Sequence, residues 1–158
     1  MRSYKVLTVC LGNICRSPAA QGILERVASN HNVFLELDSA GTAAYHIGKQ
    51  PDLRSIKALN QVGIDISHQK ARQVTQSDFY EFDWILAMDR ENLLNLEKIQ
   101  PSNSQAKLVM FGEFYDRAAF GEVVDPYYGG EEGFVAMREH LTEIAEAFVT
   151  HLQSNTED

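Results

Sequence analysis

Short apolar runs alternate with longer amphipathic segments along this chain. Four runs of five or six residues are rich in β-branched, aliphatic or aromatic side chains and lack helical spacing, which predicts buried strands. They cover residues 4–9, 33–37, 83–88 and 106–111.

Between and after these runs, apolar positions recur at intervals of three and four residues, which predicts helices. The first helix is expected from about Pro18, with Ser17 as its N-cap. A second helix opens at Pro51 and Asp52 and ends at Gly63, a residue that favours helix termination. The other predicted segments are a long loop over residues 39–48 and helices over residues 89–99 and 131–153.

Strands separated by helices imply right-handed crossovers and therefore parallel pairing. The fold class expected is α/β, with one domain over residues 1–158 and a doubly wound sheet of four parallel strands that has helices on both faces. Ligands of such sheets bind beyond the carboxyl ends of the strands. Residues 10–17 directly follow the first strand, so we expect the functional site there.

Composition and charge limit the kinds of binding partner expected for this chain. A net charge of −8 repels phosphate backbones, so nucleic acid is not expected as a partner. Apolar stretches are far shorter than the roughly 20 residues of a membrane helix, and the first five residues lack the apolar block of a signal peptide. We therefore expect no membrane association and a cytoplasmic location.

The stretch VCLGNICRSP, residues 9–18, contains both cysteines of the chain. A loop between a strand and a helix presents unpaired main-chain N–H groups and the positive end of the helix dipole, which together bind anions. Arg16 adds a permanently charged fork that grips two phosphate oxygens at once. This combination favours a phosphate ligand, held by the main chain of residues 11–16 and by Arg16.

Cys10 lies at the base of the predicted cradle, where amides, dipole and guanidinium stabilise its thiolate and make it a nucleophile. Ser17 can direct its hydroxyl at the sulfur. Gly12 allows close backbone approach, and Asn13 tolerates left-handed dihedrals. A lone cysteine is more often an inert core residue, and a lone arginine at a helix start is more often a surface charge. The spacing of the whole set favours catalysis.

The pattern Cys-x5-Arg-Ser resembles the signature loop of protein tyrosine phosphatases, and the fuller string near the N-terminus is similar to the low-molecular-weight class. Further similar segments extend the resemblance over nearly the whole chain. It implies hydrolysis of phosphotyrosine and aryl phosphates through a phosphocysteine, with no cofactor and no metal. The similar segments are residues 38–42, 71–73, 87–89 and 125–128.

Departure of an aryl oxygen needs a proton donor, and Asp125 is the candidate. Pro126 stiffens its loop, while Val123 and Val124 provide apolar surroundings that favour a protonated carboxyl. An Asp-Pro pair alone more often starts a turn, but the resemblance points to the same residue. Asp125 is expected to protonate the leaving group and then to activate the water that hydrolyses the phosphocysteine.

The walls of the pocket should select the substrate. Tyr45, Tyr127 and Tyr128, with Leu11, are expected to flank a phenyl ring in a slot too deep for phosphoserine. Loop tyrosines are also common as plain surface residues. Main-chain groups of Ile14 and Cys15 complete the predicted phosphate cradle.

The resemblance also implies a hydrogen-bonded support for Asn13, formed by Ser17, Ser39 and a histidine from the segment that matches residues 67–70. In this chain Gln69 stands at that place, and His68 comes one residue earlier. The family counterpart of Asp89 can pair with that histidine. Here Asp89 is expected to pair with Arg72 instead.

Cys15 resembles the family's resolving cysteine, which forms a reversible disulfide with the nucleophile, here Cys10, and protects it from overoxidation. An equally simple interpretation is that Cys15 only packs beneath the loop. A zinc site is not expected, because the chain has two cysteines and no histidine close to them in sequence.

Three other functions fit the same scaffold. A thiol-dependent arsenate reductase needs further cysteines, and none follows Cys15. A protein-arginine phosphatase has a threonine at the position of Ile14. A phosphate-dependent binding module would lack the catalytic residues that are present here. The expected partner is thus a phosphotyrosine-containing protein, bound by a monomer or weak homodimer.

Overall fold

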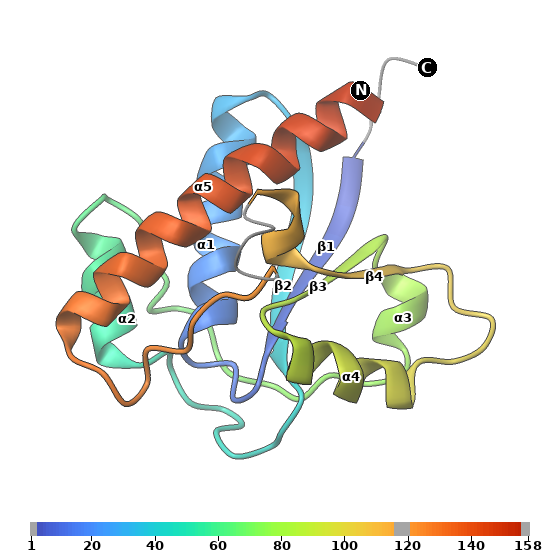
Figure 1. The fold of residues 1–158 in the computed structure, drawn as a ribbon, viewed down its shortest axis with the longest axis horizontal. Coiled ribbons are helices and arrows are strands. Elements are labelled where there is room, and N and C mark those ends of the chain that lie inside the picture. The colour runs from blue at the N-terminus through green and yellow to red at the C-terminus, as the bar shows by residue number, and fades with distance from the viewer. Residues whose placement is uncertain (1–2, 116–120, 156–158) are drawn as a thin grey trace.

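Four parallel strands form the sheet of the computed structural model, which describes residues 3–115 and 121–155. The strands lie in the order β2-β1-β3-β4 and all neighbouring pairs are parallel (Figure 1). The predicted α/β fold with a doubly wound sheet is confirmed. The strands are β1 (Ser3–Cys10), β2 (Phe34–Gly41), β3 (Trp84–Ala87) and β4 (Lys107–Met110).

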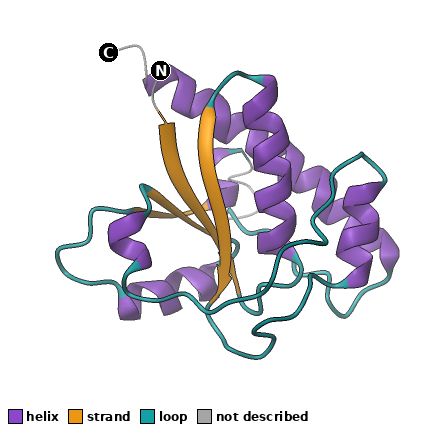
Figure 2. Cartoon of the chain, turned by 180° about the vertical axis from the view of Figure 1, so that it is seen from behind, coloured by secondary structure: helices purple, strands orange, loops and turns teal. Residues whose placement is uncertain are grey.

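Helices cover both faces of this sheet (Figure 2). The long helices α1 (Arg16–Asn30) and α5 (Glu131–Asn155) pack together on one face, and α2 (Leu53–Asn60) contacts both of them. The shorter helices α3 (Asp78–Glu81) and α4 (Arg90–Ile99) cover the other face. The 3-10 helix η1 (Phe111–Phe114) follows β4 directly.

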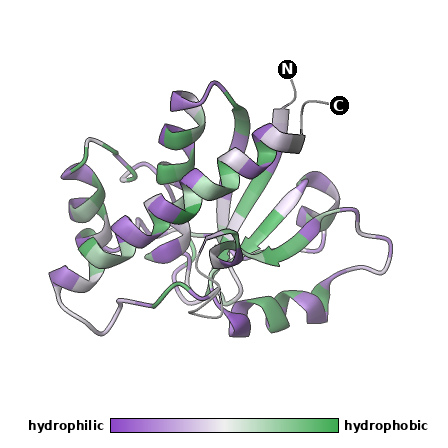
Figure 3. Ribbon diagram, turned by 45° about the horizontal axis from the view of Figure 1, so that its top comes forward, coloured by the Kyte–Doolittle hydropathy of each residue, from purple (hydrophilic) through white to green (hydrophobic). Residues whose placement is uncertain are grey.

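The alternation of side chains along the central strands explains these two layers. In β1, Val6 and Cys10 face the core under α1 and α5, whereas Leu7 and Val9 face the core under α3 and α4. A strand covered on both sides needs apolar residues at nearly every position. The buried part of β1 and the whole of β3 are accordingly mostly apolar, and green covers much of the sheet in Figure 3.

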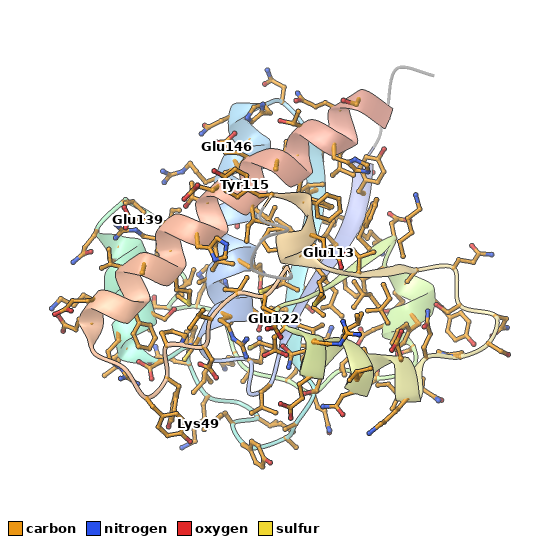
Figure 4. All side chains as sticks on the ribbon, viewed as in Figure 1. Lys49, Glu113, Tyr115, Glu122, Glu139 and Glu146 are labelled. Carbon is orange, nitrogen blue, oxygen red and sulfur yellow. The ribbon has the colours of Figure 1, made fainter. Side chains whose placement is uncertain are left out.

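An aromatic cluster anchors α5 to the sheet. The ring of Phe148 lies edge-on to Trp84 at 5.4 Å, to Phe114 at 4.9 Å and to Phe111 at 6.0 Å between centroids. Such edge-to-face pairs add stabilisation beyond burial alone. On its outer side, α5 carries exposed acidic residues such as Glu139 and Glu146 (Figure 4).

Two predicted boundaries were wrong. The segment expected as a loop from residue 39 continues β2 as far as Gly41, because β1 pairs with it up to the register Cys10–Gly41. The first helix begins at Arg16 with Cys15 at the N-cap, and Ser17 makes no cap. The hydroxyl of Ser17 instead lies 3.0 Å from the sulfur of Cys10.

Two short elements were missed, and one helix ends earlier than expected. The four-residue elements α3 and η1 are too short to show periodicity. Helix α2 ends at Asn60, and Gly63 with a φ of 78° closes the turn that follows. No helix among the described residues combines the length and the apolar character needed to cross a lipid bilayer.

Phe148→Ala should destabilise the fold by about 3–5 kcal/mol, because the cavity it leaves lies between three aromatic rings that cannot all collapse into it. The measurement is urea-induced unfolding followed by circular dichroism. Glu143→Ala, at an exposed position of the same helix, is the control and should change the unfolding free energy by about 0.5 kcal/mol or less. A loss below about 1 kcal/mol for Phe148→Ala would contradict this account of the core.

Candidate active site

The loop that joins β1 to α1 lies at the carboxyl edge of the sheet, and the segment leading into α5 passes beside it (Figure 1). We call residues 10–16 the phosphate loop. A cavity of about 260 Å³ opens above it. Its lining combines the phosphate loop with two other segments: Cys10, Leu11, Gly12, Ile14, Cys15, Arg16, Tyr45, His46, Asp125, Tyr127 and Tyr128.

Cys10 ends β1 at the floor of this cavity and is 3% exposed. Two hydrogen-bond donors converge on its sulfur: the main-chain N–H of Asn13 at 3.3 Å and the hydroxyl of Ser17 at 3.0 Å. Both are suited to a negatively charged acceptor. The hydroxyl of Ser17 lies against the sulfur of Cys10, as expected from the sequence.

Asn13 holds the turn of the phosphate loop. Its φ of 60° lies in the left-handed region, which asparagine tolerates better than most residues. Its side-chain NH2 group donates to the hydroxyl oxygens of Ser17 and Ser39, both at 2.9 Å. Its side-chain carbonyl oxygen accepts from the main-chain N–H of Arg72 at 3.0 Å. Buried and fully bonded, Asn13 fixes the loop against β2 and the residues around Arg72.

Gln69 extends this network. The hydroxyl of Ser39 donates to its side-chain carbonyl at 3.4 Å, and its amide donates to the carbonyl of Pro18 at 3.1 Å. Since Asn13 gives a hydrogen to each serine oxygen, each serine hydroxyl is left to donate its own hydrogen onward. Ser39 donates to Gln69, and Ser17 has two acceptors within reach, the sulfur of Cys10 at 3.0 Å and the carbonyl of Ala40 at 3.5 Å, of which the sulfur is the nearer. His68 is exposed, so Gln69 takes the supporting place.

Arg16 is held in the cavity wall with its side chain 4% exposed. It donates to Asp89 at 2.7 Å and to the carbonyl of Val123 at 3.0 Å, and it lies 3.7 Å from Asp125. Burial opposes its charge, but the anionic groups of Cys10, Asp89 and Asp125 outweigh burial and raise the pKa of the guanidinium above its ordinary value. Arg16 therefore stays charged, and its hydrogen bonds to Asp89 and Val123 fix its position in the cavity wall.

The predicted pairing of Asp89 with Arg72 is wrong. Asp89 binds Arg16 and also caps α4, because its carboxylate accepts from the N–H of Asn92 at 2.8 Å. Arg72 instead donates to Asp38 and Asp78, both at 3.0 Å. Four carboxylates, those of Asp89, Asp125, Asp38 and Asp78, lie close to two arginines here, and the local sequence does not determine which pairs form.

Asp125 lines the cavity, with its carboxylate 3.7 Å from the guanidinium of Arg16. Its side chain is 42% exposed, and one carboxylate oxygen accepts from the N–H of Tyr127 at 3.0 Å. The apolar surroundings expected on both sides are present only in part, because Val123 is buried whereas Val124 is 78% exposed. Asp125 thus faces the cavity from a solvent-accessible loop.

The predicted tyrosine walls are present. Tyr45, Tyr127 and Tyr128 all line the cavity; Tyr45 is 73% exposed and Tyr128 95% exposed, and the rings of Tyr127 and Tyr128 lie edge-on with centroids 5.0 Å apart. At Gly12 a Cβ atom would come within 2.8 Å of the ring of His46, so a side chain has little room there.

Two residues of this region were missed. Asp52 and Arg54, at the start of α2, form an ion pair at 3.0 Å next to the cavity. The N-cap position of Asp52 was visible in the sequence, but nothing there indicated that Arg54 reaches residues 127–129. Over the described ranges of the chain, no three His, Cys, Asp or Glu side chains are placed to hold a metal ion.

Cys15 lies in the same loop as Cys10 but in a different environment. Burial, followed by the negative charges of Asp52, Cys10 and Asp125, raises the pKa of its thiol well above the ordinary value, although Arg54 acts in the opposite direction. An acid whose pKa is raised stays protonated until the pH exceeds that raised value. Cys15 is therefore a neutral thiol at neutral pH.

Alkylation should separate the two cysteines. At pH 7 iodoacetamide should modify Cys15 more slowly than Cys10, because the raised pKa of Cys15 leaves it almost no thiolate and only a thiolate reacts quickly. Peptide mass spectrometry at successive times measures both sites. In the urea-unfolded protein both should react at similar rates, which serves as the control. Faster labelling of Cys15 in the folded protein would contradict the environment described here.

Known proteins of similar sequence belong to one described family. The model of the family described as low molecular weight phosphotyrosine protein phosphatase matches residues 5–158. A protein of that name from Schizosaccharomyces pombe is 40% identical over 151 residues, covering 94% of this chain and 96% of the relative. The human protein of that name is 39% identical over 148 residues, covering 91% and 92%.

Two solved phosphatase structures share the fold of this chain. A protein tyrosine phosphatase from Entamoeba histolytica superposes with a TM-score of 0.90 at 39% identity, covering 96% of this chain and 98% of that one. A Drosophila arginine phosphatase superposes with a TM-score of 0.89 at 34% identity, covering 98% and 99%.

Proposed function

The chain belongs to the low molecular weight phosphotyrosine protein phosphatase family and is a protein-tyrosine phosphatase, and we propose that it acts through a phosphocysteine formed on Cys10. The observation that carries this proposal is the convergence on one sulfur of the Asn13 N–H and the Ser17 hydroxyl, at 3.3 and 3.0 Å. Arg16 and Asp125 line the same cavity.

In the first step, the Cys10 thiolate attacks phosphorus in line, so that an S–P bond forms as the bond to the aryl oxygen breaks. Asp125 gives its proton to that oxygen, which leaves as a phenol. The N–H groups of the phosphate loop and the guanidinium of Arg16 stabilise the negative charge on the three remaining oxygens. Arg16 is suited to this, because its contacts with Asp89 and Val123 fix its position before substrate binds.

In the second step, Asp125 is ionised and takes a proton from a water molecule that attacks phosphorus. The S–P bond breaks, inorganic phosphate is released and the thiolate is restored. The hydroxyl of Ser17, held as a donor by Asn13, stabilises the sulfur both as it attacks and as it departs.

The proposed substrate is a phosphotyrosine-containing protein. The aromatic walls formed by Tyr45, Tyr127 and Tyr128 suit a phenyl ring inserted between them. The similarity to an arginine phosphatase makes phosphoarginine the competing substrate. Ile14 lines the cavity with a hydrocarbon side chain and offers no hydroxyl to orient attack on a phosphoramidate, which favours phosphotyrosine.

Cys15 is proposed as the resolving thiol of Cys10. Peroxide would oxidise the Cys10 thiolate to a sulfenic acid, and the Cys15 thiol would then displace water and form a disulfide. Both residues line the same cavity. Mass spectrometry after mild peroxide treatment should find a bridge between Cys10 and Cys15. Sulfinic acid on Cys10 without a bridge would leave Cys15 a packing residue.

Cys10→Ser should abolish hydrolysis of phosphotyrosine, because a neutral hydroxyl does not attack phosphorus at a useful rate, while inorganic phosphate should still bind. Turnover is measured by phosphate release and binding by calorimetry.

Wild-type protein should release phosphate from phosphotyrosine at least about 10-fold faster than from phosphoarginine, which corresponds to about 1.4 kcal/mol of discrimination. The reverse preference would favour the arginine phosphatase function.

Asp125→Ala should lower kcat/KM for phenyl phosphate by about 100-fold or more, since general acid catalysis contributes about 10²–10⁴-fold. The loss for p-nitrophenyl phosphate should be much smaller, because its leaving group needs little protonation. Steady-state kinetics on both substrates provides the comparison. An equal loss on the two would remove Asp125 from the role of general acid.

A further inference from the structure

The segment that carries Asp125 has little internal stiffness. Residues 124–130, which we call the acid loop, are all exposed except for Pro126 and end in two glycines. Their internal hydrogen bonds are local: the Tyr127 N–H donates to Asp125 at 3.0 Å, and the Gly129 N–H donates to the carbonyl of Pro126 at 2.9 Å. The position of Asp125 over the cavity therefore depends on contacts with other elements.

Arg54 provides such contacts from α2. Its guanidinium donates to the carbonyl of Tyr127 and to the carbonyl of Gly129, both at 2.9 Å. The same group lies 5.6 Å from the centroid of the Tyr127 ring and 4.5 Å from that of Phe134, the first buried residue along α5. One side chain thus grips the acid loop at two carbonyls and one ring.

The opposite side of this arrangement is attached to the phosphate loop. Arg54 donates twice to the carboxylate of Asp52, at 3.0 Å each, and the N–H of Asp52 donates to the carbonyl of Ile14 at 2.8 Å. The hydroxyl of Ser55 donates to the carbonyl of Cys15 at 3.2 Å. The start of α2 is therefore bonded to the loop of the nucleophile and to the loop of the acid.

Resting on the function proposed above, we propose that Arg54 is a positioning residue that sets the place of the Asp125 carboxyl relative to the sulfur of Cys10. A misplacement of about 1 Å in a reacting group can cost about 100-fold in rate, so a clamp between the two loops has a direct kinetic consequence. Arginine suits the task because its planar fork reaches a carboxylate and two carbonyls at once, which the single ammonium of lysine does not.

Arg54 is not placed to bind the substrate phosphate itself. Hydrogen bonds to Asp52, Tyr127 and Gly129 already occupy four of the five N–H groups of its guanidinium. The ion pair with Asp52 also offsets its charge, and hydrogen bonding to Arg54 lowers the pKa of Asp52 below its ordinary value. Asp52 therefore stays ionised throughout the neutral pH range, so its ion pair with Arg54 persists there.

The test compares two aryl phosphates in Arg54→Gln and Arg54→Lys. For both variants kcat/KM on phenyl phosphate, which needs the acid, should fall by about 10- to 100-fold. On p-nitrophenyl phosphate the fall should be less than about 3-fold, and the inhibition constant of inorganic phosphate should change by less than about 2-fold, because the phosphate loop is intact. Both small changes are expected if the Arg54 variants impair only the protonation of the leaving group by Asp125.

Arg26→Gln is the matched control. Arg26 also donates to two main-chain carbonyls of a loop, those of Val62 and Gly63, but lies on the far part of α1, away from the cavity. Its replacement should leave kcat/KM on both substrates unchanged within about 2-fold. Thermal unfolding by circular dichroism identifies any variant that does not fold. If Arg54→Gln does not fold, the kinetics of Arg54→Lys decide.

The double variant Arg54→Gln, Asp125→Ala separates the two proposals. If Arg54 acts through Asp125, adding Arg54→Gln to Asp125→Ala should change kcat/KM on phenyl phosphate by less than about 3-fold, although it costs about 10-fold or more alone. Equal loss on both substrates in the single Arg54 variants, with a selective loss in Asp125→Ala, would overturn the role of Arg54. No selective loss in Asp125→Ala would overturn the assignment of the acid itself.

Discussion

The convergence of hydrogen-bond donors on the sulfur of Cys10, inside a chain of net charge −8, is the interaction on which the rest of this structure depends. The nucleophile proposed for that place requires donors that are fixed before the substrate arrives. The structure supplies the N–H of Asn13 and the hydroxyl of Ser17, with the buried cation of Arg16 in the same loop. Each of these groups is oriented by further contacts, so the loop cannot relax away from the sulfur without breaking several bonds.

The hydrogen bonds around Asn13 have a fixed direction. Its amide has two hydrogens and gives one to each of two serines, which leaves both serine hydroxyls as donors. Ser39 donates to Gln69, and the nearer acceptor of Ser17 is the sulfur of Cys10 at 3.0 Å, with the carbonyl of Ala40 at 3.5 Å. Gln69 cannot change its charge, so this orientation does not depend on a titrating side chain at that position. The left-handed backbone of Asn13 adds a second reason for an asparagine there.

The fold brings these groups together because parallel strands end at a common edge. The phosphate loop follows β1, the wall that carries Tyr45 follows β2, and Asp89 follows β3 closely. The acid loop arrives at the same edge just before α5 and is held there by Arg54. Strand β1 thus positions Cys10, the proposed nucleophile, whereas an exposed loop positions Asp125, the proposed acid.

The sequence alone determined the parallel α/β fold, the central strands and the main helices, because apolar periodicity and the requirement for a sheet covered on both faces act within short segments. It also identified the phosphate loop, whose residues are consecutive. Only the tertiary structure decided that Cys15 and not Ser17 is the N-cap of α1, that Asp89 pairs with Arg16 and not Arg72, and that Val124 faces solvent. It alone brought Arg54 to Tyr127, 73 positions away. Ion pairs and long side chains choose among many partners that are equally available in sequence, and only the packing of the whole chain limits that choice.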